Sequence, residues 1–335
     1  GESLQNIEPI LPEIRALQTE YGDQLKFWAI HSQPDADRDE LKAEAVAMGI
    51  DFPVLQDPSQ VVTRNLSPGS YPEAFAVRSF DWTHFYQGAI ETSVDTGNSV
   101  IKNRYLKDAL VQFFAAEPVS VEMAEGSGQP ANMEEFGAIS YSDEIAPLLA
   151  EHCVRCHSEG NIGPFPLDSY LSVAQNAFLI KHQVMSGEMP PWHADERYGR
   201  FTNETKLAPK EKAKLIEWIN QGAKRGEGDD PLMIASVPAL EEWPLGQPDY
   251  IVEIPKQDIP ADGTVDYRYI VVASPVPDDV WLKAAVIAPG NPEVVHHSLI
   301  FMISDPRDLF AVQGGLSGFF AGYVPGLDAD FFPEG

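Results

Sequence analysis

HCVRCHSEG, residues 152–160, holds both cysteines of this 335-residue chain and places a histidine directly after the second. The spacing C-x-x-C-H is typical of covalent haem attachment, in which two thioether bonds hold the porphyrin and the histidine binds the iron. We therefore expect Cys153 and Cys156 to carry one haem c, with His157 as the proximal iron ligand. A helix through IAPLLAEHC, residues 145–153, is expected before the motif, with Ser142 as its N-cap.

The two cysteines have other interpretations, which the rest of the sequence weakens. A structural zinc site needs two further thiolate or imidazole ligands at a similar spacing, and the sequence has no second cysteine pair. A disulfide framework needs more cysteines than two. A chance pair of structural cysteines leaves the adjacent histidine unexplained. The sequence therefore favours the haem interpretation.

The distal iron ligand has four candidates in IKHQVMSGEMPPWHAD, residues 180–195: His182, Met185, Met189 and His193. We predict Met189, because the two prolines after it lack backbone donors and force an extended chain that can hold a thioether at the iron. Thioether ligation raises the reduction potential. The alternative is that Met189 is a core side chain and that a histidine, or no residue, binds the distal face.

The middle of the chain resembles the small cytochrome c domains of multidomain redoxin proteins from environmental bacteria. The resemblance rests on GEMPPWHAD, on Gly199-Arg200-Phe201 and on the helix-forming LAPKEKAKLIEWINQGA. It implies an all-α monohaem cytochrome c domain over residues 139–228, and it supports Met189 as the distal ligand.

The N-terminal part, residues 1–118, alternates between strand-like and helix-like patterns, which predicts an α/β sheet. The expected strands are residues 25–32, 52–57, 74–77 and 84–90, and the expected helices are residues 37–48 and 105–116.

This part resembles the redoxin branch of the thioredoxin fold in EIRALQTEYGDQLKFWAIHS, IDFPVLQDPSQVV and SYPEAFAV. The resemblance implies a cis peptide bond at Pro72, beside the redox cysteines. In the family those cysteines lie at the start of the first helix, and residues 1–118 contain none. Two alternatives follow: an active redoxin whose cysteines lie upstream of Gly1, or a thioredoxin-like scaffold.

The C-terminal part is predicted to be all-β. Residues 119–138 are small and acidic and are interpreted as a linker, and an acidic, proline-containing stretch follows the middle domain. From there to the end, over residues 229–335, four β-rich runs occur: YIVEI, DYRYIVVAS, VWLKAAVIA and VVHHSLIFMI.

Three segments of this part, QPDYIVEIP, WLKAAVIAPGNPEVVHHSLIFM and FAGYVPG, resemble the first half of the copper type II, ascorbate-dependent monooxygenases. The best-known member of that family is peptidylglycine α-hydroxylating monooxygenase. The resemblance implies a jelly-roll sandwich in which His296 and His297 bind copper. Neighbouring residues on a regular strand point to opposite faces, so both can hold one ion only where the strand bends. The family's third imidazole and second copper site would fall after Gly335. The alternative is a structural histidine pair.

The charge of the chain restricts its partners. It has 51 acidic and 23 basic residues, a formal net charge of -28, which disfavours nucleic acid and anionic lipid and favours a redox partner with a basic or neutral surface. No apolar run is long enough to predict a membrane span. The N-terminus lacks the pattern of a signal peptide. His31, His84 and His152 are assigned no chemistry.

Together these features predict a multidomain redox protein that is periplasmic or extracellular, because haem c is attached outside the cytoplasm. The haem would pass single electrons within a copper-dependent monooxygenase-like oxidoreductase that acts on a small-molecule substrate. One alternative is a pure electron-transfer or structural component of an assembly. A second is a redoxin-type thiol oxidoreductase with its cysteines upstream of Gly1.

Overall fold

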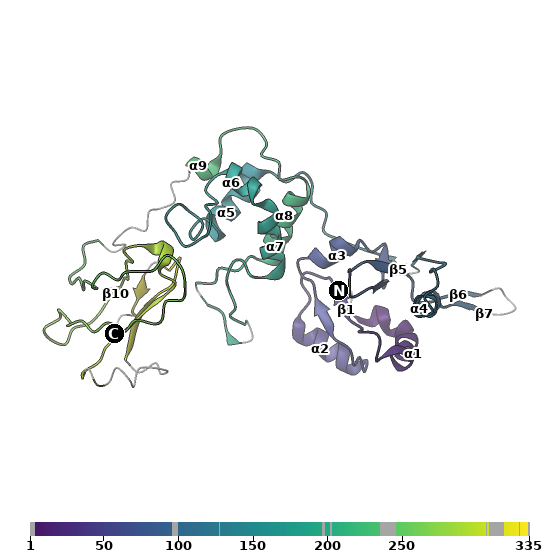
Figure 1. Cartoon of the computed structure of the whole chain (residues 1–335). Helices are drawn as coiled ribbons and strands as arrows, with labels where there is room; N and C mark the ends of the chain where they lie inside the picture. Colours follow the sequence, from purple (N-terminus) through teal and green to yellow (C-terminus); the bar gives the residue numbers. More distant parts are fainter. Residues whose placement is uncertain are drawn as a thin grey trace. The chain divides into compact units, whose positions relative to one another are not determined.

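The computed structural model describes residues 4–95, 100–126, 128–195, 198–201, 203–234, 246–305, 307, 318–327 and 329–333. The chain divides into two compact units (Figure 1). The first unit is Gly1–Ala138 with Leu207–Glu217, and the second is Ile139–Lys206 with Trp218–Gly335. One division thus falls at the end of the predicted linker. The regions predicted as a cytochrome and a β domain lie mostly in the second unit.

The first unit mixes helices and short strands. Its helices are η1 (Leu4–Ile10), α1 (Leu11–Tyr21), α2 (Arg38–Ala47), α3 (Val61–Leu66) and α4 (Tyr105–Phe114). Its strands are β1 (Ala29–His31), β2 (Val54–Gln56), β3 (Ser70–Tyr71), β4 (Ala74–Val77), β5 (His84–Gly88), β6 (Thr92–Asp95), β7 (Val100–Asn103), β8 (Met123–Ala124) and β9 (Gln129–Pro130).

The strands of the first unit form several small sheets rather than the single sheet that the pattern predicts. Strands β1 and β2 pair in parallel, β4, β5 and β8 form a three-stranded sheet, and β3 pairs with β9. Strands β8 and β9 come from residues 119–138. The segment that was predicted to be a linker therefore contributes two strands to this unit. The peptide bond between Tyr71 and Pro72 is cis, as the resemblance implies.

Helices α2 and α4 have clear causes in the sequence. The Asp37 carboxylate accepts hydrogen bonds from the backbone N–H groups of Asp39 and Glu40, so it caps the start of α2. Helix α4 buries Leu106, Ala109 and Leu110 at helical spacing, and they join Leu17 and Tyr86 in one apolar core. Both helices begin and end within two residues of the predicted positions.

The helices of the second unit are short. They are η2 (Tyr141–Ile145), α5 (Ala146–His152), α6 (Tyr170–Gln175), α7 (Ala177–Ser186) and α9 (Pro231–Ile234), and α8 (Pro209–Asn220) is divided between the units. Figure 1 shows α5, α6 and α7 grouped together in teal. The prediction of Ser142 as N-cap was wrong. Ser140 is the cap, because its backbone is extended and its side chain accepts from the Asp143 N–H, while Glu144 accepts from the Ser140 N–H.

The buried carboxylate of Asp230 joins three segments of the helical part of the second unit through hydrogen bonds. Asp230 is only 7% exposed and accepts hydrogen bonds from the Tyr141 hydroxyl at 2.9 Å and from the Tyr170 and Leu232 N–H groups. The Tyr141 ring stacks on Trp218, with the two centroids 5.7 Å apart. Burial and the bond to Asp230 raise the pKa of Tyr141, so its hydroxyl stays protonated and donates.

Replacing this carboxylate is expected to destabilise the second unit. Asp230→Ala leaves the buried Tyr141 hydroxyl and two backbone N–H groups without their acceptor, so we expect the free energy of unfolding to fall by about 3 kcal/mol. Chemical denaturation followed by circular dichroism measures the change. The neighbouring Asp229 is exposed, and Asp229→Ala serves as the matched control, with a change of about 0.5 kcal/mol or less. Equal losses in the two variants would contradict the assignment.

The C-terminal region forms fewer strands than its sequence predicts. Its strands are β10 (Ala284–Ala285), β11 (Ser298–Phe301), β12 (Phe319–Tyr323) and β13 (Asp330–Phe331), which pair as β10 with β13 and β11 with β12. The strands predicted over YIVEI and DYRYIVVAS are absent from residues 246–283. That segment is solvent-exposed over nearly all of its length, with Trp281 90% exposed. Its residues therefore do not pack against a partner strand, although their pattern favours a strand. The jelly-roll sandwich stays a prediction.

Among the residues that the structure describes, no helix combines the length and apolar character needed to cross a membrane.

Candidate haem site

The C-x-x-C-H motif forms a compact turn at the end of α5. The Cys153 N–H donates to the Leu149 carbonyl at 2.9 Å, which continues the helix by one residue. The Cys153 carbonyl then accepts from the Cys156 N–H at 3.1 Å and from the His157 N–H at 2.9 Å. This turn brings both thiols and the imidazole onto one short stretch of ordered backbone.

The ring of His157 is held in a defined orientation. Its Nδ1 lies 2.9 Å from the Phe165 carbonyl oxygen, and the two rings have centroids 5.3 Å apart. Because a carbonyl can only accept, Nδ1 carries the proton and Nε2 keeps a free lone pair. A hydrogen bond of this kind fixes the tautomer and raises the basicity of a metal-binding imidazole. The geometry therefore suits His157 as an iron ligand through Nε2.

Gly163, which lies outside the motif, makes this arrangement sterically feasible. A Cβ atom at Gly163 would lie 2.6 Å from His157 Nδ1 and 2.7 Å from the Cys156 carbonyl oxygen. Its N–H donates to that carbonyl at 2.8 Å. Neither Gly163 nor Phe165 has a chemical signature in the sequence, because one acts by lacking a side chain and the other through its backbone.

The two thiols lack the lowered pKa values of redox-active cysteines. Cys153 and Cys156 are not bonded to each other. Burial raises the pKa of Cys153 to about 12, and burial also raises the pKa of Cys156, against the opposing effect of the Arg155 charge. Active cysteines of disulfide oxidoreductases have lowered pKa values instead. These thiols therefore stay protonated near neutral pH.

A zinc site is also disfavoured in the described part of the chain, which contains no group of three or more histidine, cysteine, aspartate or glutamate side chains placed to hold one ion. Two reduced cysteines beside an imidazole with an open Nε2 fit a covalently bound haem c. Cys153 and Cys156 would hold it, and His157 would bind its iron.

The candidate distal ligands lie on α7 and the segment after it. Helix α7 ends at Gly187, whose left-handed backbone turns the chain away, and the Met189 N–H donates to the Gln183 carbonyl at 3.2 Å. The Met189 side chain is 39% exposed, and Met185, His182 and His193 are also exposed. The hydrogen bond and ring contact of His157 are both with Phe165, so the structure does not join it to any of these four. The assignment of Met189 stays a prediction.

The predicted copper ligands do lie together. His296 Nδ1 and His297 Nδ1 are 3.0 Å apart, and the Tyr267 ring lies 5.6 Å from the His297 ring. The strand predicted through both histidines begins only at Ser298, and η4 (Pro292–Val294) precedes them. Both histidines thus lie outside regular strand, so the alternation of faces does not separate them. Two ligand nitrogens that share one ion at about 2.0 Å each are about 3 Å apart.

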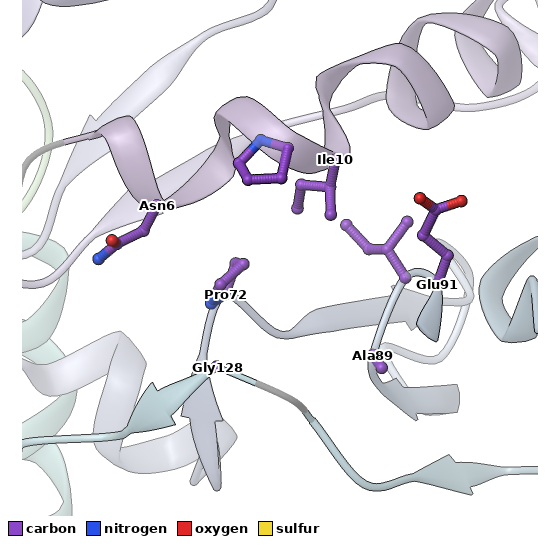
Figure 2. A pocket seen from close by; sticks show the side chains of 8 residues that line it. Asn6, Ile10, Pro72, Ala89, Glu91 and Gly128 are labelled. Carbon is purple, nitrogen blue, oxygen red and sulfur yellow. The ribbon is translucent and has the colours of Figure 1, made fainter. Parts of the chain in front are cut away.

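A cavity of about 190 Å³ lies beside Pro72 in the first unit. Its lining is Asn6, Pro9, Ile10, Pro72, Ala89, Ile90, Glu91 and Gly128. Figure 2 shows the polar side chains of Asn6 and Glu91 at opposite ends and Pro72 facing the η1 segment. The cavity lies where the redoxin resemblance places thiol chemistry, and no cysteine lines it. Its residues offer packing and two polar groups but no nucleophile.

The remaining histidines have structural contacts. His152 Nδ1 lies 3.2 Å from the Thr205 carbonyl oxygen, and the His84 ring packs edge-on against Phe75.

Comparisons with known proteins add little to these observations. No protein-family model and no curated protein matches the chain. Two solved structures are similar to part of it. An uncharacterized conserved protein from Geobacillus kaustophilus has 19% identity and a TM-score of 0.34, over 40% of this chain and 72% of that one. A hypothetical protein from Sinorhizobium meliloti has 20% identity and a TM-score of 0.33, over 40% and 74%.

Proposed function

We propose that this chain is an exported haem c redox protein that transfers single electrons within a copper-dependent monooxygenase-like oxidoreductase. The observation that carries the proposal is the turn at Cys153–His157, in which the Phe165 carbonyl fixes the His157 ring with Nε2 open. The raised pKa values of both thiols favour haem over thiol chemistry. Within the described residues the two thiols and the His157 imidazole are not placed to hold one ion together, and a structural zinc site would need four such ligands.

Each residue of the site has one role in this proposal. Haem iron, when bound, gains and loses one electron at a time. Cys153 and Cys156 hold the group covalently, so it cannot dissociate between electron transfers. His157 binds the iron and Phe165 orients the ring, and Met189 is proposed as the second axial ligand, which would raise the reduction potential.

The copper part of the proposal rests on His296 and His297. Their Nδ1 atoms form a hydrogen bond at 3.0 Å, and neutral imidazole suits copper, so copper would have to replace the shared proton between the two rings. Copper bound there would relay single electrons from the haem. Two electrons and two protons would reduce dioxygen, so that one oxygen atom would enter a C–H bond of a small-molecule substrate and the other would leave as water. A pure electron-transfer component without this activity is the alternative, and it is favoured by the presence of two rather than three clustered histidines in the described residues.

The surroundings proposed for this chemistry follow from charge and from haem attachment. A formal charge of -28 favours a redox partner with a basic or neutral surface over nucleic acid. Covalent haem attachment places the protein in the periplasm or outside the cell.

Metal and haem analysis of the same preparation tests the proposal. We expect the full chain, matured with haem and dialysed against copper, to retain about one haem and one copper per chain. His296→Ala/His297→Ala should keep the haem and lose the copper, because both imidazole ligands are gone. His84→Ala, a histidine in the other unit, is the control and should retain both. Copper retained by the double variant, or absent from the unaltered chain, would refute the copper assignment.

A further inference from the structure

The turn after strand β12 lies directly against the haem-binding motif, inside the second unit. Gly326 has a left-handed backbone with φ of +85°, and a Cβ atom there would lie 2.8 Å from Arg155 Cδ and 3.4 Å from Cys156 Sγ. The Arg155 guanidinium donates a hydrogen bond to the Gly326 carbonyl. The turn is therefore held by a charged hydrogen bond, and a side chain at position 326 would contact both Arg155 and the sulfur that would carry the haem.

The same turn leads into the strand pair that carries the histidines. Tyr323, the last residue of β12, is 4% exposed and pairs with Ser298 across the antiparallel ladder. Ser298 follows His297 directly. The chain thus runs from Gly326, beside Cys156, along three peptide units to Tyr323, which pairs with Ser298, the residue after His297.

We propose that the turn formed by residues 324–327 is a docking element that joins the histidine pair to the Cys156 edge of the haem site and provides the path for electrons between them. This inference rests on the proposed function. Haem iron, when bound, would give up one electron, and copper held by the histidines would accept it, so that one metal would be oxidised as the other is reduced. No atom is transferred. Burial raises the pKa of Tyr323, so its phenol stays neutral and no proton has to move.

Two variants weaken this contact and a third provides a matched control. Gly326→Ala introduces a Cβ atom into the contact with Arg155 and Cys156, and Arg155→Gln removes the charged hydrogen bond. Gly263 has a similar left-handed backbone, with φ of +90°, but no atom lies within 4 Å of the position that a Cβ atom would take there. Gly263→Ala therefore imposes comparable backbone strain without affecting the contact.

Two measurements on the full haem-loaded chain test the proposal. The first is hydrogen exchange of residues 324–327 and 153–157 in copper-free protein. The second is the rate at which ferrous haem is reoxidised after one equivalent of cupric ion binds, with His296→Ala/His297→Ala giving the background rate. We expect Gly326→Ala and Arg155→Gln to speed exchange in both segments and to slow reoxidation at least tenfold. Gly263→Ala should change neither.

The outcomes separate this inference from the proposed function. Unchanged exchange and unchanged reoxidation in Gly326→Ala, or equal slowing in Gly263→Ala, would overturn the docking turn while copper binding stands. Copper that binds to the unaltered chain without reoxidising its haem faster than background would overturn the electron path alone. If the chain binds no copper, the copper part of the proposed function fails, and the electron path fails with it.

Discussion

Cys153→Ser/Cys156→Ser is expected to carry no covalent haem. Serine has no thiol to add across a haem vinyl group, so the double variant keeps only the axial bonds to the iron, from His157 and from the proposed ligand Met189. Intact mass under denaturing conditions should equal that of the bare polypeptide, whereas the unaltered chain should show the added mass of one haem. The absorption of the haem should also be lost on denaturation, because a group held by axial ligands alone dissociates when the chain unfolds.

The single variants and a neighbouring substitution sharpen this result. Cys153→Ser and Cys156→Ser should each keep covalent haem through one thioether, with the α band of the reduced pyridine complex moved to longer wavelength by the vinyl group that remains. Glu159 is exposed and close to the motif, so Glu159→Gln should bind haem as the unaltered chain does. Covalent haem in the double variant would show that the motif is not the attachment site.

Met189→Ala is expected to remove the absorption band that marks a methionine–iron bond in the oxidised protein and to lower the reduction potential. The reason is that a thioether stabilises ferrous over ferric iron, and alanine leaves water or a histidine to fill the position. Axial ligands shift haem potentials within a span of about 0.8 V, so the change should be large. Redox titration followed by visible absorption measures both effects.

Met185→Ala is the control for this experiment, because Met185 is an exposed methionine at the end of α7, the helix that precedes Met189. It should keep the band and the potential. If the band survives in Met189→Ala and disappears in Met185→Ala, the ligand is Met185. A band that is absent already from the unaltered protein would point to ligation by His182 or His193, or to an open distal face.

Local patterns predicted the helices better than the strands. Helices α2, α4 and α8 lie close to their predicted positions because each depends on spacing, caps and breakers within one short segment. Strands need a partner from elsewhere in the chain, and alternation alone does not provide one. Residues 250–274 alternate well yet form no strand, whereas β8 and β9 form within a segment predicted to be a linker.

The residues of the candidate site also differ in whether the sequence could predict them. Cys153, Cys156 and His157 could be selected from the sequence because thioether attachment dictates their spacing along the chain. Phe165 and Gly163 could not, because a backbone carbonyl and a missing side chain leave no chemical pattern to search for. His296 and His297 were selected by resemblance alone, and alternation on a strand argued against a shared ion.

The sequence by itself determined the features that are local: the C-x-x-C-H motif, the helix before it, the acidic charge, and the adjacency of two histidines. Only the tertiary structure decided which atoms meet. It placed Nδ1 of His157 on the Phe165 carbonyl, brought the His296 and His297 rings together ahead of β11, and set Gly326 on Cys156. Each of these contacts joins atoms whose positions depend on turns and packing rather than on residue type, so a pattern along the chain carries no record of them.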